Sequence, residues 1–200
     1  MGFQMQNSEL SNITNLIFEL GQLRLETRRG WQRIGLRPEN VAEHSLRAAQ
    51  IAYILAIQEE YPNPHYVATL LVFHDMAETR TGDPDHVVKQ YVKTDQEAAV
   101  RDQTAKLEEM GKAIFRMWET VEQAETHAGK IAKDADRLEM AFTAKTLLAQ
   151  GHKGAQQFID SAGQSLKTDS AKQLFEALQD AAPDDWWWGV IGKSEARAEA

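Results

Sequence analysis

The sequence predicts an all-α protein built as a single domain. Apolar residues recur at helical spacing along nearly the whole chain, and no stretch alternates between apolar and polar residues as a half-buried strand does. The chain has 200 residues, of which 42% are hydrophobic, so it is long enough to bury one sizeable core. It contains no internal repeat, low-complexity block or linker. We therefore expect residues 1–200 to form one domain, with a core over about 8–180 and a tail over 181–200.

The composition argues against several other classes of protein. The net charge is −8, and an acidic chain is a poor general binder of DNA or RNA backbone. There is no cysteine, which excludes disulfides and thiolate metal ligands and is typical of cytosolic proteins. No apolar run is long enough for a transmembrane helix, and the N-terminus lacks the features of a secretory signal. We expect a cytoplasmic protein with no membrane or nucleic-acid polymer as partner.

The first third of the chain predicts two helices joined by a basic connection. The first helix is expected over about residues 8–26. The connection over 27–38 contains two glycines, one proline and four arginines, which indicates a loop with charged groups available for binding. The second helix is expected over about residues 39–60, where Pro62 and Pro64 end it.

The middle of the chain predicts two further helices around a loop. The third helix is expected over about residues 65–80, and residues 81–84 break it because glycine suits the helix cap and proline restricts the residue before it. A short helical turn is expected over 87–91. The fourth helix is expected over about residues 95–119, with a weak point at residues 109–111.

The last third predicts one long helix, two short ones and an apolar tail. The long helix is expected over about residues 128–150, and the short ones over about 155–162 and 168–179. The tail holds three adjacent tryptophans, Trp186–Trp188, before a polar end from Lys193. Three exposed indoles would form a large apolar surface patch that favours association, so we expect them to be buried in a turn against the body or a second subunit.

Polar residues interrupt the apolar run of the third helix in a way that indicates a metal site. His74 shares the inward face of Leu70 and Leu71, and Glu78 follows on the same face. Asp75 is the neighbour of His74 in the chain. Burying an imidazole and carboxylates without partners is costly, and a divalent metal is the simplest compensation. The alternative is a satisfied core histidine with solvated acids at a helix end.

Two other helices carry residues of the same kind. His44 lies at the edge of the inner stripe of the second helix, and Asp136 lies next to the core side of the fifth. His44, His74, Asp75 and Asp136 would form one site if these helices pack together. Imidazole and carboxylate ligands with open positions suit one divalent ion, Mn, Co, Zn, Ni, Mg or Fe, and such an ion acidifies a bound water.

The four candidate ligands, in this order and on predicted helices, resemble those of the HD-domain metal-dependent phosphohydrolases. Their neighbours resemble one branch of that family, which includes the bacterial 5′-deoxynucleotidases and related eukaryotic HD-domain proteins. The resemblance extends over roughly residues 16–148. The segments that carry it are Glu39–Ser45, His74–Glu78, Thr81–Asp83 and Asp136–Met140.

The resemblance implies a helical bundle with one metal ion at its centre and a homodimer. It implies that Glu78 and Asp83 are the acids that transfer protons and handle the attacking water and the leaving oxygen. Their alternative roles are helix solvation and capping. It also implies that Trp31 and an arginine before it hold sugar and phosphate; either Arg28 or Arg29 could be that arginine, and we favour Arg28.

Other positions match the family less closely. Lys89 falls where a basic residue follows the Gly-Asp loop and is expected to contact substrate. Residues 84–86, Pro-Asp-His, depart from the pattern usual after that loop, which bears on the contacts to sugar and base. Dinuclear members need extra histidines, and His127 is the only serious spare ligand here. We expect it and the other three histidines outside the ligand set to be ordinary surface or loop residues.

The function that these expectations favour is metal-dependent hydrolysis of (deoxy)nucleoside 5′-monophosphates to nucleoside and phosphate by attack of a metal-bound water. The same site could instead serve a phosphodiesterase, a nucleoside triphosphohydrolase or an iron oxygenase. A third possibility is a non-catalytic helical module stabilised by metal, although a structural site would need neither Glu78 nor Asp83. The sequence does not indicate the base preference, the selectivity for deoxyribose or the physiological metal.

Overall fold

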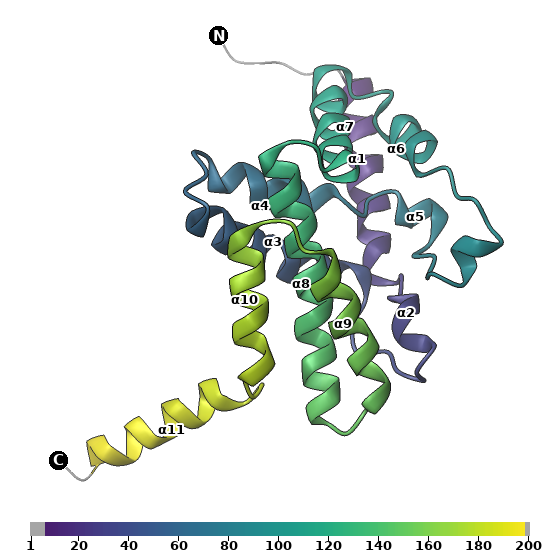
Figure 1. Cartoon of the computed structure of the whole chain (residues 1–200). Helices are drawn as coiled ribbons and strands as arrows, with labels where there is room; N and C mark the ends of the chain where they lie inside the picture. Colours follow the sequence, from purple (N-terminus) through teal and green to yellow (C-terminus); the bar gives the residue numbers. More distant parts are fainter. Residues whose placement is uncertain (1–6, 199–200) are drawn as a thin grey trace.

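The computed structural model describes residues 7–198 and confirms the all-α prediction (Figure 1). Over these residues there is no strand, only an isolated antiparallel bridge between Thr27 and Asn40. None of the helices in this part of the chain is both long and apolar enough to span a membrane. The elements are α1 (Asn7–Leu20), η1 (Gly21–Arg24), α2 (Arg29–Gln32), α3 (Val41–Gln58), α4 (Pro64–Phe73), α5 (Glu78–Thr81), η2 (Val88–Gln90), α6 (Gln96–Thr104), α7 (Glu108–Gln123), α8 (His127–Ala149), η3 (Lys153–Ala155), α9 (Gln156–Ser165), α10 (Asp169–Asp180) and α11 (Asp185–Ala198).

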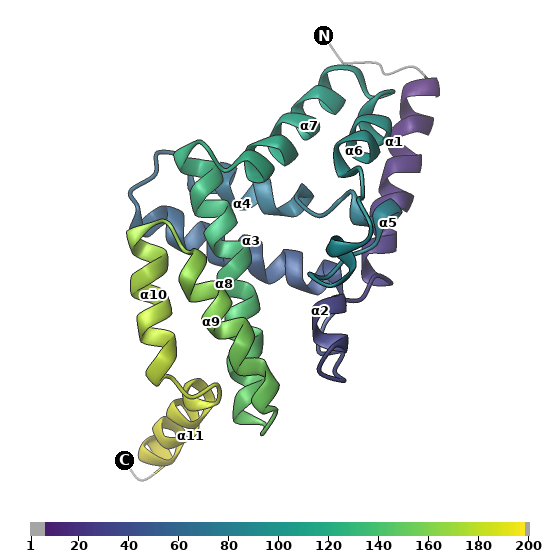
Figure 2. The same cartoon turned by 45° about the vertical axis from the view of Figure 1, so that its right-hand side comes forward.

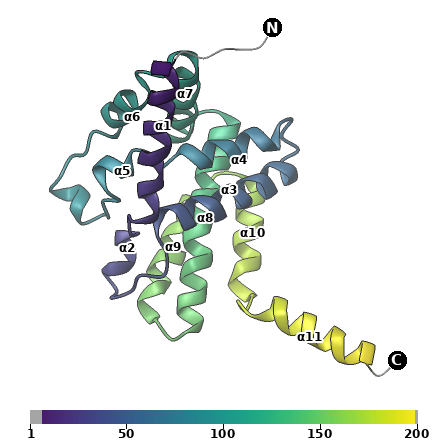
Figure 3. The same cartoon turned by 180° about the vertical axis from the view of Figure 1, so that it is seen from behind.

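The long helix α8 runs through the middle of the molecule. Helix α9 lies beside it, and α3 and α4 cross it (Figures 1 and 3). The largest apolar cluster lies where α3, α4 and α8 meet, so the residues at this crossing are removed from water. Its fully buried members include Ala52, Leu55, Leu70, Ile131 and Leu138.

A second apolar cluster holds α1, α6 and α7 together at one end of the molecule, as Figure 2 shows. Leu16 of α1, Val100 of α6 and Trp118 of α7 are buried there. Met76, which directly follows the predicted His-Asp pair, is fully buried in the same cluster. The turn that carries His74 and Asp75 therefore lies between two packed cores, which restricts its movement.

Helix α3 begins one turn from the site, at a strong N-terminal signal. The Asn40 side chain accepts a hydrogen bond from the Glu43 backbone, and the Glu43 carboxylate accepts one from the Asn40 backbone, both at 2.9 Å. This capping box satisfies two donors that a helix end leaves unpaired. It places the first helical residue at Val41, so Glu39 lies outside the helix that the sequence predicted to include it.

The predicted third helix is interrupted at the His-Asp pair. Helix α4 ends at Phe73, residues 74–77 form a turn, and α5 runs only from Glu78 to Thr81. Within the turn, Met76 and Glu78 donate to carbonyls three residues back, as in a 3₁₀ helix. Apolar periodicity does not distinguish this tighter winding from an α-helix, which is why the sequence predicted one continuous helix.

The predicted fourth helix is also divided, but earlier than the sequence indicated. The break lies at residues 105–107, between α6 and α7, and Glu108 adopts a left-handed backbone with φ of 48°. Gly111, which we expected to mark the weak point, lies inside α7. A Cβ atom there would lie 2.1 Å from the Thr104 carbonyl oxygen, so the glycine allows the two helices to approach closely.

The tail forms a helix that points away from the body, so the prediction of a turn was wrong. Helix α11 projects from the end of α10 in all three views (Figures 1, 2 and 3). Trp186, Trp187 and Trp188 are 75%, 42% and 56% exposed, so the predicted burial against the body was wrong as well. The rings of Trp187 and Trp188 stack with centroids 4.6 Å apart, and the Trp188 indole donates to Asp184 at 3.0 Å.

Candidate metal centre

Three elements bring the four predicted ligands to one point. His44 comes from α3, His74 and Asp75 from the turn after α4, and Asp136 from α8. Nε2 of His44 lies 3.1 Å from Oδ1 of Asp136 and 3.6 Å from Oδ2 of Asp75. Nε2 of His74 lies 3.2 Å from the same Asp75 oxygen and 3.9 Å from Asp136. The ligand atoms of His44, His74 and Asp75 all lie within 4.8 Å of one another, a spacing that could hold a metal ion, and Asp136 lies beside this group.

The buried atoms of this cluster fit a cation. Nε2 of His44, Nε2 of His74 and Oδ2 of Asp75 are all buried, and none of them has a hydrogen-bond partner. The 3.1 Å approach of His44 to Asp136 is close, but it is not in hydrogen-bonding geometry. Buried polar atoms are rarely left unpaired because their desolvation is not recovered. Two imidazoles and two carboxylates without sulfur suit a borderline divalent metal.

Hydrogen bonds on the far side of each imidazole set the tautomer that a metal needs. Nδ1 of His74 lies 2.9 Å from the Leu71 carbonyl oxygen, which can only accept, so this nitrogen is the donor. Nδ1 of His44 lies 2.5 Å from Oε2 of Glu139, a carboxylate oxygen that accepts, so Nδ1 is the donor here as well. With Nδ1 as the donor, Nε2 of each ring faces the cluster, and its lone pair is the one that a metal would use.

A cavity of about 300 Å³ opens beside the cluster. Asp75 and Asp136 line it, so a bound metal would face this space. The structure also brings to it all five residues that the sequence predicted for catalysis and substrate binding. These are Arg28, Trp31, Glu78, Asp83 and Lys89.

Arg28, rather than Arg29, lies next to the predicted ligands. Its Nη1 is 3.8 Å from Oδ2 of Asp75 and 3.6 Å from Oδ1 of Asp83. Burial lowers the pKa of Arg28, but the charges of Asp83 and Asp75 raise it by more than burial lowers it. The net pKa is therefore above its ordinary value, and the guanidinium stays charged. Arg29 instead donates its backbone N–H to Asp83 at 2.9 Å, and its side chain lies against Gly82.

Glu78 is an acid in an unusual environment. Its side chain is 5% exposed, and its Oε2 atom is buried without a hydrogen-bond partner. Burial raises the pKa of the Glu78 carboxyl well above its ordinary value, and the nearby Asp75 and Asp83 raise it further. A carboxyl whose pKa is raised keeps its proton to a higher pH than an ordinary glutamate does, which suits it to donate a proton.

Trp31 forms a fixed wall of the cavity. Its ring is 2% exposed, packs on Phe158 with centroids 4.4 Å apart, and donates through Nε1 to Oε1 of Glu39 at 2.9 Å. Gly30 permits this packing, because a Cβ atom there would lie 3.3 Å from the Phe158 ring. The indole is therefore held from both its face and its polar edge.

The loop that departs from the family pattern also lines the cavity. Asp85 accepts from Nε of Arg33 at 2.8 Å and from the backbone of Val87 at 2.7 Å. These bonds tie the loop to the region around α2 and start the turn that leads to η2. His86 and Lys89 are exposed and face the cavity from this loop.

Two residues that the sequence reasoning missed lie on α8 within a turn of Asp136. Lys133 lines the cavity, with Nζ 3.7 Å from Asp136 and 3.4 Å from Glu122. Burial lowers the pKa of Lys133, but Asp136 and Glu122 raise it above its ordinary value, so it remains a cation. Glu139 is the partner of His44. The spacing of three residues from Asp136 could have indicated both.

His127, the spare ligand considered from the sequence, does not join this cluster. Its side chain is 49% exposed, and Nε2 contacts Oε2 of Glu59 at 2.9 Å. Among the described residues, a second group with metal-ligand spacing combines Glu39, His44 and Glu139. The Arg47 guanidinium pairs with both carboxylates of that group, so it already supplies the positive charge that a metal would bring there.

A helical bundle that gathers two imidazoles and two carboxylates beside a cavity defines a metal-binding protein of the His-Asp type. A family model described as HD domain matches residues 20–179, and the chain belongs to this family.

The chain is 30% identical to 5′-deoxynucleotidase HDDC2 of Homo sapiens over 167 residues, 80% of this chain and 81% of that protein. It is 41% identical to a 5′-deoxynucleotidase of Erwinia tasmaniensis over 61 residues, 28% of this chain and 31% of that protein. A crystal structure described as genomics APC5600 superimposes with a TM-score of 0.74 at 32% identity, covering 88% of this chain and 99% of that one.

Proposed function

We propose that the protein is a metal-dependent phosphohydrolase that releases phosphate from (deoxy)nucleoside 5′-monophosphates. The observation that carries this proposal is the set of buried, unpaired ligand atoms of His44, His74 and Asp75, which lies beside the cavity that holds Arg28 and Glu78. Relatives named 5′-deoxynucleotidase, including the human one over 80% of this chain, support the choice of substrate. The cavity, at about 300 Å³, has the size of a small-molecule site.

His44, His74, Asp75 and Asp136 would hold one divalent metal ion. When bound, the ion would supply Lewis acidity and a water acidified for attack on phosphorus. Asp75 also lies 3.8 Å from the Arg28 guanidinium, and Asp136 lies 3.7 Å from the Lys133 ammonium. Each carboxylate ligand is thus next to a cation, which limits the negative charge that an incoming phosphate would meet.

The phosphate would be held by cations on both sides of the ligand cluster. Arg28 has a planar guanidinium that can donate two parallel hydrogen bonds to phosphate oxygens. Lys133 faces the cavity from α8, and Lys89 faces it from η2. The transferred phosphoryl group stays anionic and negative charge develops on the leaving oxygen, so these cations would stabilise the transition state.

Proton transfer would fall to Glu78 and Asp83. The raised pKa of the buried Glu78 carboxyl suits it to donate a proton to the leaving 5′ oxygen of the nucleoside. Asp83 lies 3.6 Å from Arg28 and accepts from the Arg29 backbone, so it would hold Arg28 in place and accept a proton from water. The Trp31 ring would support the sugar, because it forms a buried wall of the same cavity.

The test is phosphate release across a panel of nucleotides. Metal-stripped protein is mixed with Mn²⁺, Co²⁺, Zn²⁺, Ni²⁺, Mg²⁺ or Fe²⁺ and with deoxyribose and ribose 5′-monophosphates. Nucleoside 3′-monophosphates, a phosphodiester and nucleoside triphosphates serve as comparison substrates. We expect metal-dependent release of inorganic phosphate from 5′-monophosphates. Release of pyrophosphate or triphosphate, with the monophosphates inert, would contradict the proposal.

The proposal also covers assembly and location. We infer a homodimer in which α11 contacts the second subunit, because its three tryptophans are exposed on the single chain. A cytoplasmic location is part of the same proposal and agrees with a chain that has no cysteine.

A further inference from the structure

A fully buried carboxylate lies directly behind the metal-facing histidine. Glu139 is 0% exposed, and its Oε2 atom lies 2.5 Å from Nδ1 of His44, on the opposite side of the ring from the ligand cluster. It follows Asp136 by about one turn of α8. One helix therefore supplies both a predicted ligand and the group that contacts the back of another ligand.

The second oxygen of Glu139 is held by an arginine from the helix that carries His44. Nε of Arg47 donates to Oε1 of Glu139 at 2.8 Å, and Nη2 of Arg47 contacts Glu139 and Thr143. Arg47 follows His44 by about one turn of α3, so the ligand and the arginine straddle the same carboxylate. A carboxylate bound on both oxygens has one allowed orientation, and the imidazole it contacts is fixed with it.

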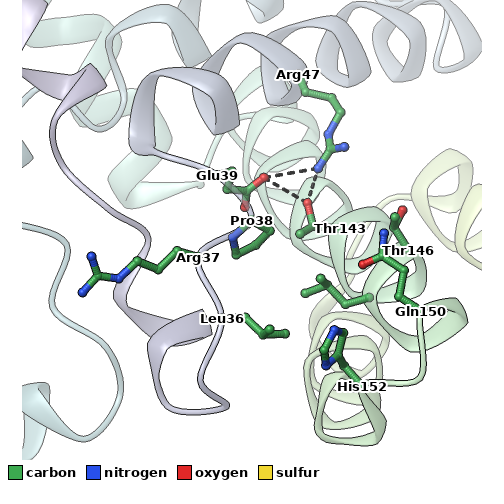
Figure 4. Close-up of a pocket in the computed structure, with 10 residues that line it drawn as sticks. Leu36, Arg37, Pro38, Glu39, Arg47, Thr143, Thr146, Gln150 and His152 are labelled. Atoms are coloured by element: carbon green, nitrogen blue, oxygen red, sulfur yellow. Dashed lines mark hydrogen bonds and ion pairs between the residues drawn. The ribbon is translucent and has the colours of Figure 1, made fainter.

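The same network continues to the substrate cavity. The Thr143 hydroxyl lies 3.2 Å from Glu139 and 3.0 Å from Glu39. Figure 4 shows Glu39, Arg47 and Thr143 meeting at one point, with their interactions marked. Glu39 in turn accepts from the indole of Trp31 at 2.9 Å. A continuous set of hydrogen bonds and ion pairs thus joins a predicted metal ligand to the wall that faces the substrate.

The network is open to solvent at one end. Arg47 is 43% exposed and lines a cavity of about 410 Å³, separate from the one beside the metal ligands. Figure 4 shows this cavity, with Arg37, Gln150 and His152 around it. Small solutes can therefore reach the guanidinium position without passing the predicted active site.

We propose that Glu139 and Arg47 are positioning residues that set the metal affinity of His44. This inference rests on the proposed metal site. The Glu139 carboxylate holds the proton of His44 on Nδ1, points Nε2 at the cluster and raises the basicity of that nitrogen. Arg47 prevents the carboxylate from rotating away. Loss of such an outer partner typically weakens metal affinity by about 10- to 100-fold.

The experiment measures Co²⁺ binding by visible absorption, on metal-stripped full-length protein, so that no turnover is needed. We expect Glu139→Ala to bind Co²⁺ about 10- to 100-fold more weakly than the wild type and with an altered absorption band. Glu139→Gln, which keeps an acceptor for Nδ1, should retain much of the affinity. The matched control is Asp134→Ala, which removes an equally buried carboxylate of α8 that instead binds the backbone of Lys167 and Thr168. This control should lower thermal stability and leave Co²⁺ affinity unchanged.

A second variant gives an independent answer if Glu139→Ala does not fold. Arg47→Ala removes a partly exposed side chain, and the open cavity should admit methylguanidinium in its place. We expect weaker Co²⁺ binding by Arg47→Ala and partial recovery on adding methylguanidinium. Methylammonium, which lacks the planar fork, should restore less. Methylguanidinium should not help Glu139→Ala.

The outcomes separate this inference from the proposed function. Wild-type Co²⁺ affinity in folded Glu139→Ala and in Arg47→Ala would overturn the positioning role and leave the metal site intact. A wild-type protein that binds no metal under any condition would overturn both. An equal loss of affinity in Asp134→Ala would show that any buried defect in α8 weakens binding, and it would also reject a specific role for Glu139.

Discussion

The indole Nε1 of Trp31 donates to Oε1 of Glu39 at 2.9 Å, and this bond connects the wall of the candidate substrate cavity to the residues behind the predicted metal ligands. Trp31 lies in the short helix α2, whereas Glu39 lies just before the capping box of α3. The position of the indole therefore depends on where α3 begins. Trp31 is far more buried than its place in a basic connection would suggest, and the Glu39 side chain is only 8% exposed.

The first prediction concerns this bond. Glu39→Ala leaves a buried indole N–H without an acceptor, which typically costs about 1–3 kcal/mol. We expect the free energy of unfolding in urea to fall by that amount and the KM for a 5′-mononucleotide to rise more than kcat changes. Trp31→Phe, combined with Glu39→Ala, should recover part of the stability because it removes the orphaned donor. A double variant as unstable as the sum of both single variants would contradict this explanation.

The second prediction concerns metal content. After reconstitution, elemental analysis of the wild type should give about one divalent ion per chain, because one set of four ligand atoms converges. Asp136→Ala should retain far less, since this carboxylate is the only predicted ligand from α8. His127→Ala is the control, because His127 lies outside the cluster and pairs with Glu59. Equal metal content in wild type and Asp136→Ala would remove Asp136 from the ligand set.

The third prediction assigns Glu78 to chemistry rather than to metal binding. Its carboxyl is buried and lines the same cavity as Arg28 and Asp83, and it is not one of the four predicted ligands. Glu78→Gln should keep the fold and the metal and lower kcat by about 10²–10⁴-fold, as removal of a general acid does. The measurement pairs phosphate release with metal analysis on the same sample. Turnover at the wild-type rate would leave Glu78 with only a structural role.

The fourth prediction is a pH dependence of stability that originates outside the site. Glu59 accepts from the Ser170 backbone and contacts His127, which links the end of α3 to α10 and α8. Burial raises the pKa of Glu59, but the bonds from Ser170 and His127 outweigh it, so the net pKa is lowered from 4.5. A lowered folded-state pKa gives stability that is present above the unfolded pKa and is lost as pH falls through the folded value.

Glu59→Gln should therefore lower the free energy of unfolding at pH 7 by about 1 kcal/mol. The difference from wild type should shrink as the pH falls below about 4.5, where the unfolded state takes up a proton first, and it should be lost once the pH falls below the folded pKa as well. Urea unfolding at several pH values measures this. Glu109→Gln is the control, since Glu109 is exposed and pairs only with Lys112. A difference that grows on acidification would contradict the assignment.

The predicted ligands were visible in the sequence because each is a polar residue on or beside an apolar helical face. Periodicity places such residues toward the core, and a core position for His44 or His74 requires a reason. Glu139 is also a polar residue on a buried helical face, but its role was missed because its partner His44 is distant in the chain and only packing of α3 on α8 brings them together. Lys133 was missed for a related reason, since a lysine on a helix is ordinarily solvated.

Boundaries and the tail were predicted less well. The switch to 3₁₀ winding at residues 74–77 depends on hydrogen bonding that apolar spacing does not report. The close approach of Gly111 to Thr104 shows that a glycine inside a helix can serve packing rather than a break. Burial of Trp186–Trp188 was inferred from hydrophobicity alone, which does not indicate whether the covering surface belongs to the same chain.

The last prediction concerns those tryptophans. Successive helix residues turn by about 100°, so the three indoles leave α11 in different directions, although the rings of Trp187 and Trp188 stack on each other. All three are exposed on the single chain, and Asp184 and Asp185 precede them, which disfavours an anionic membrane. A second copy that wraps α11 would bury them, and a dimer of this kind is stabilised at higher protein concentration. Deleting residues 184–200 should reduce the mass in solution from dimer to monomer and abolish the concentration dependence of the thermal midpoint. Deleting only residues 193–200, which keeps the tryptophans, should change neither. A full-length chain that is monomeric at high concentration, or a truncated chain that is still dimeric, would rule out α11 as the dimer contact.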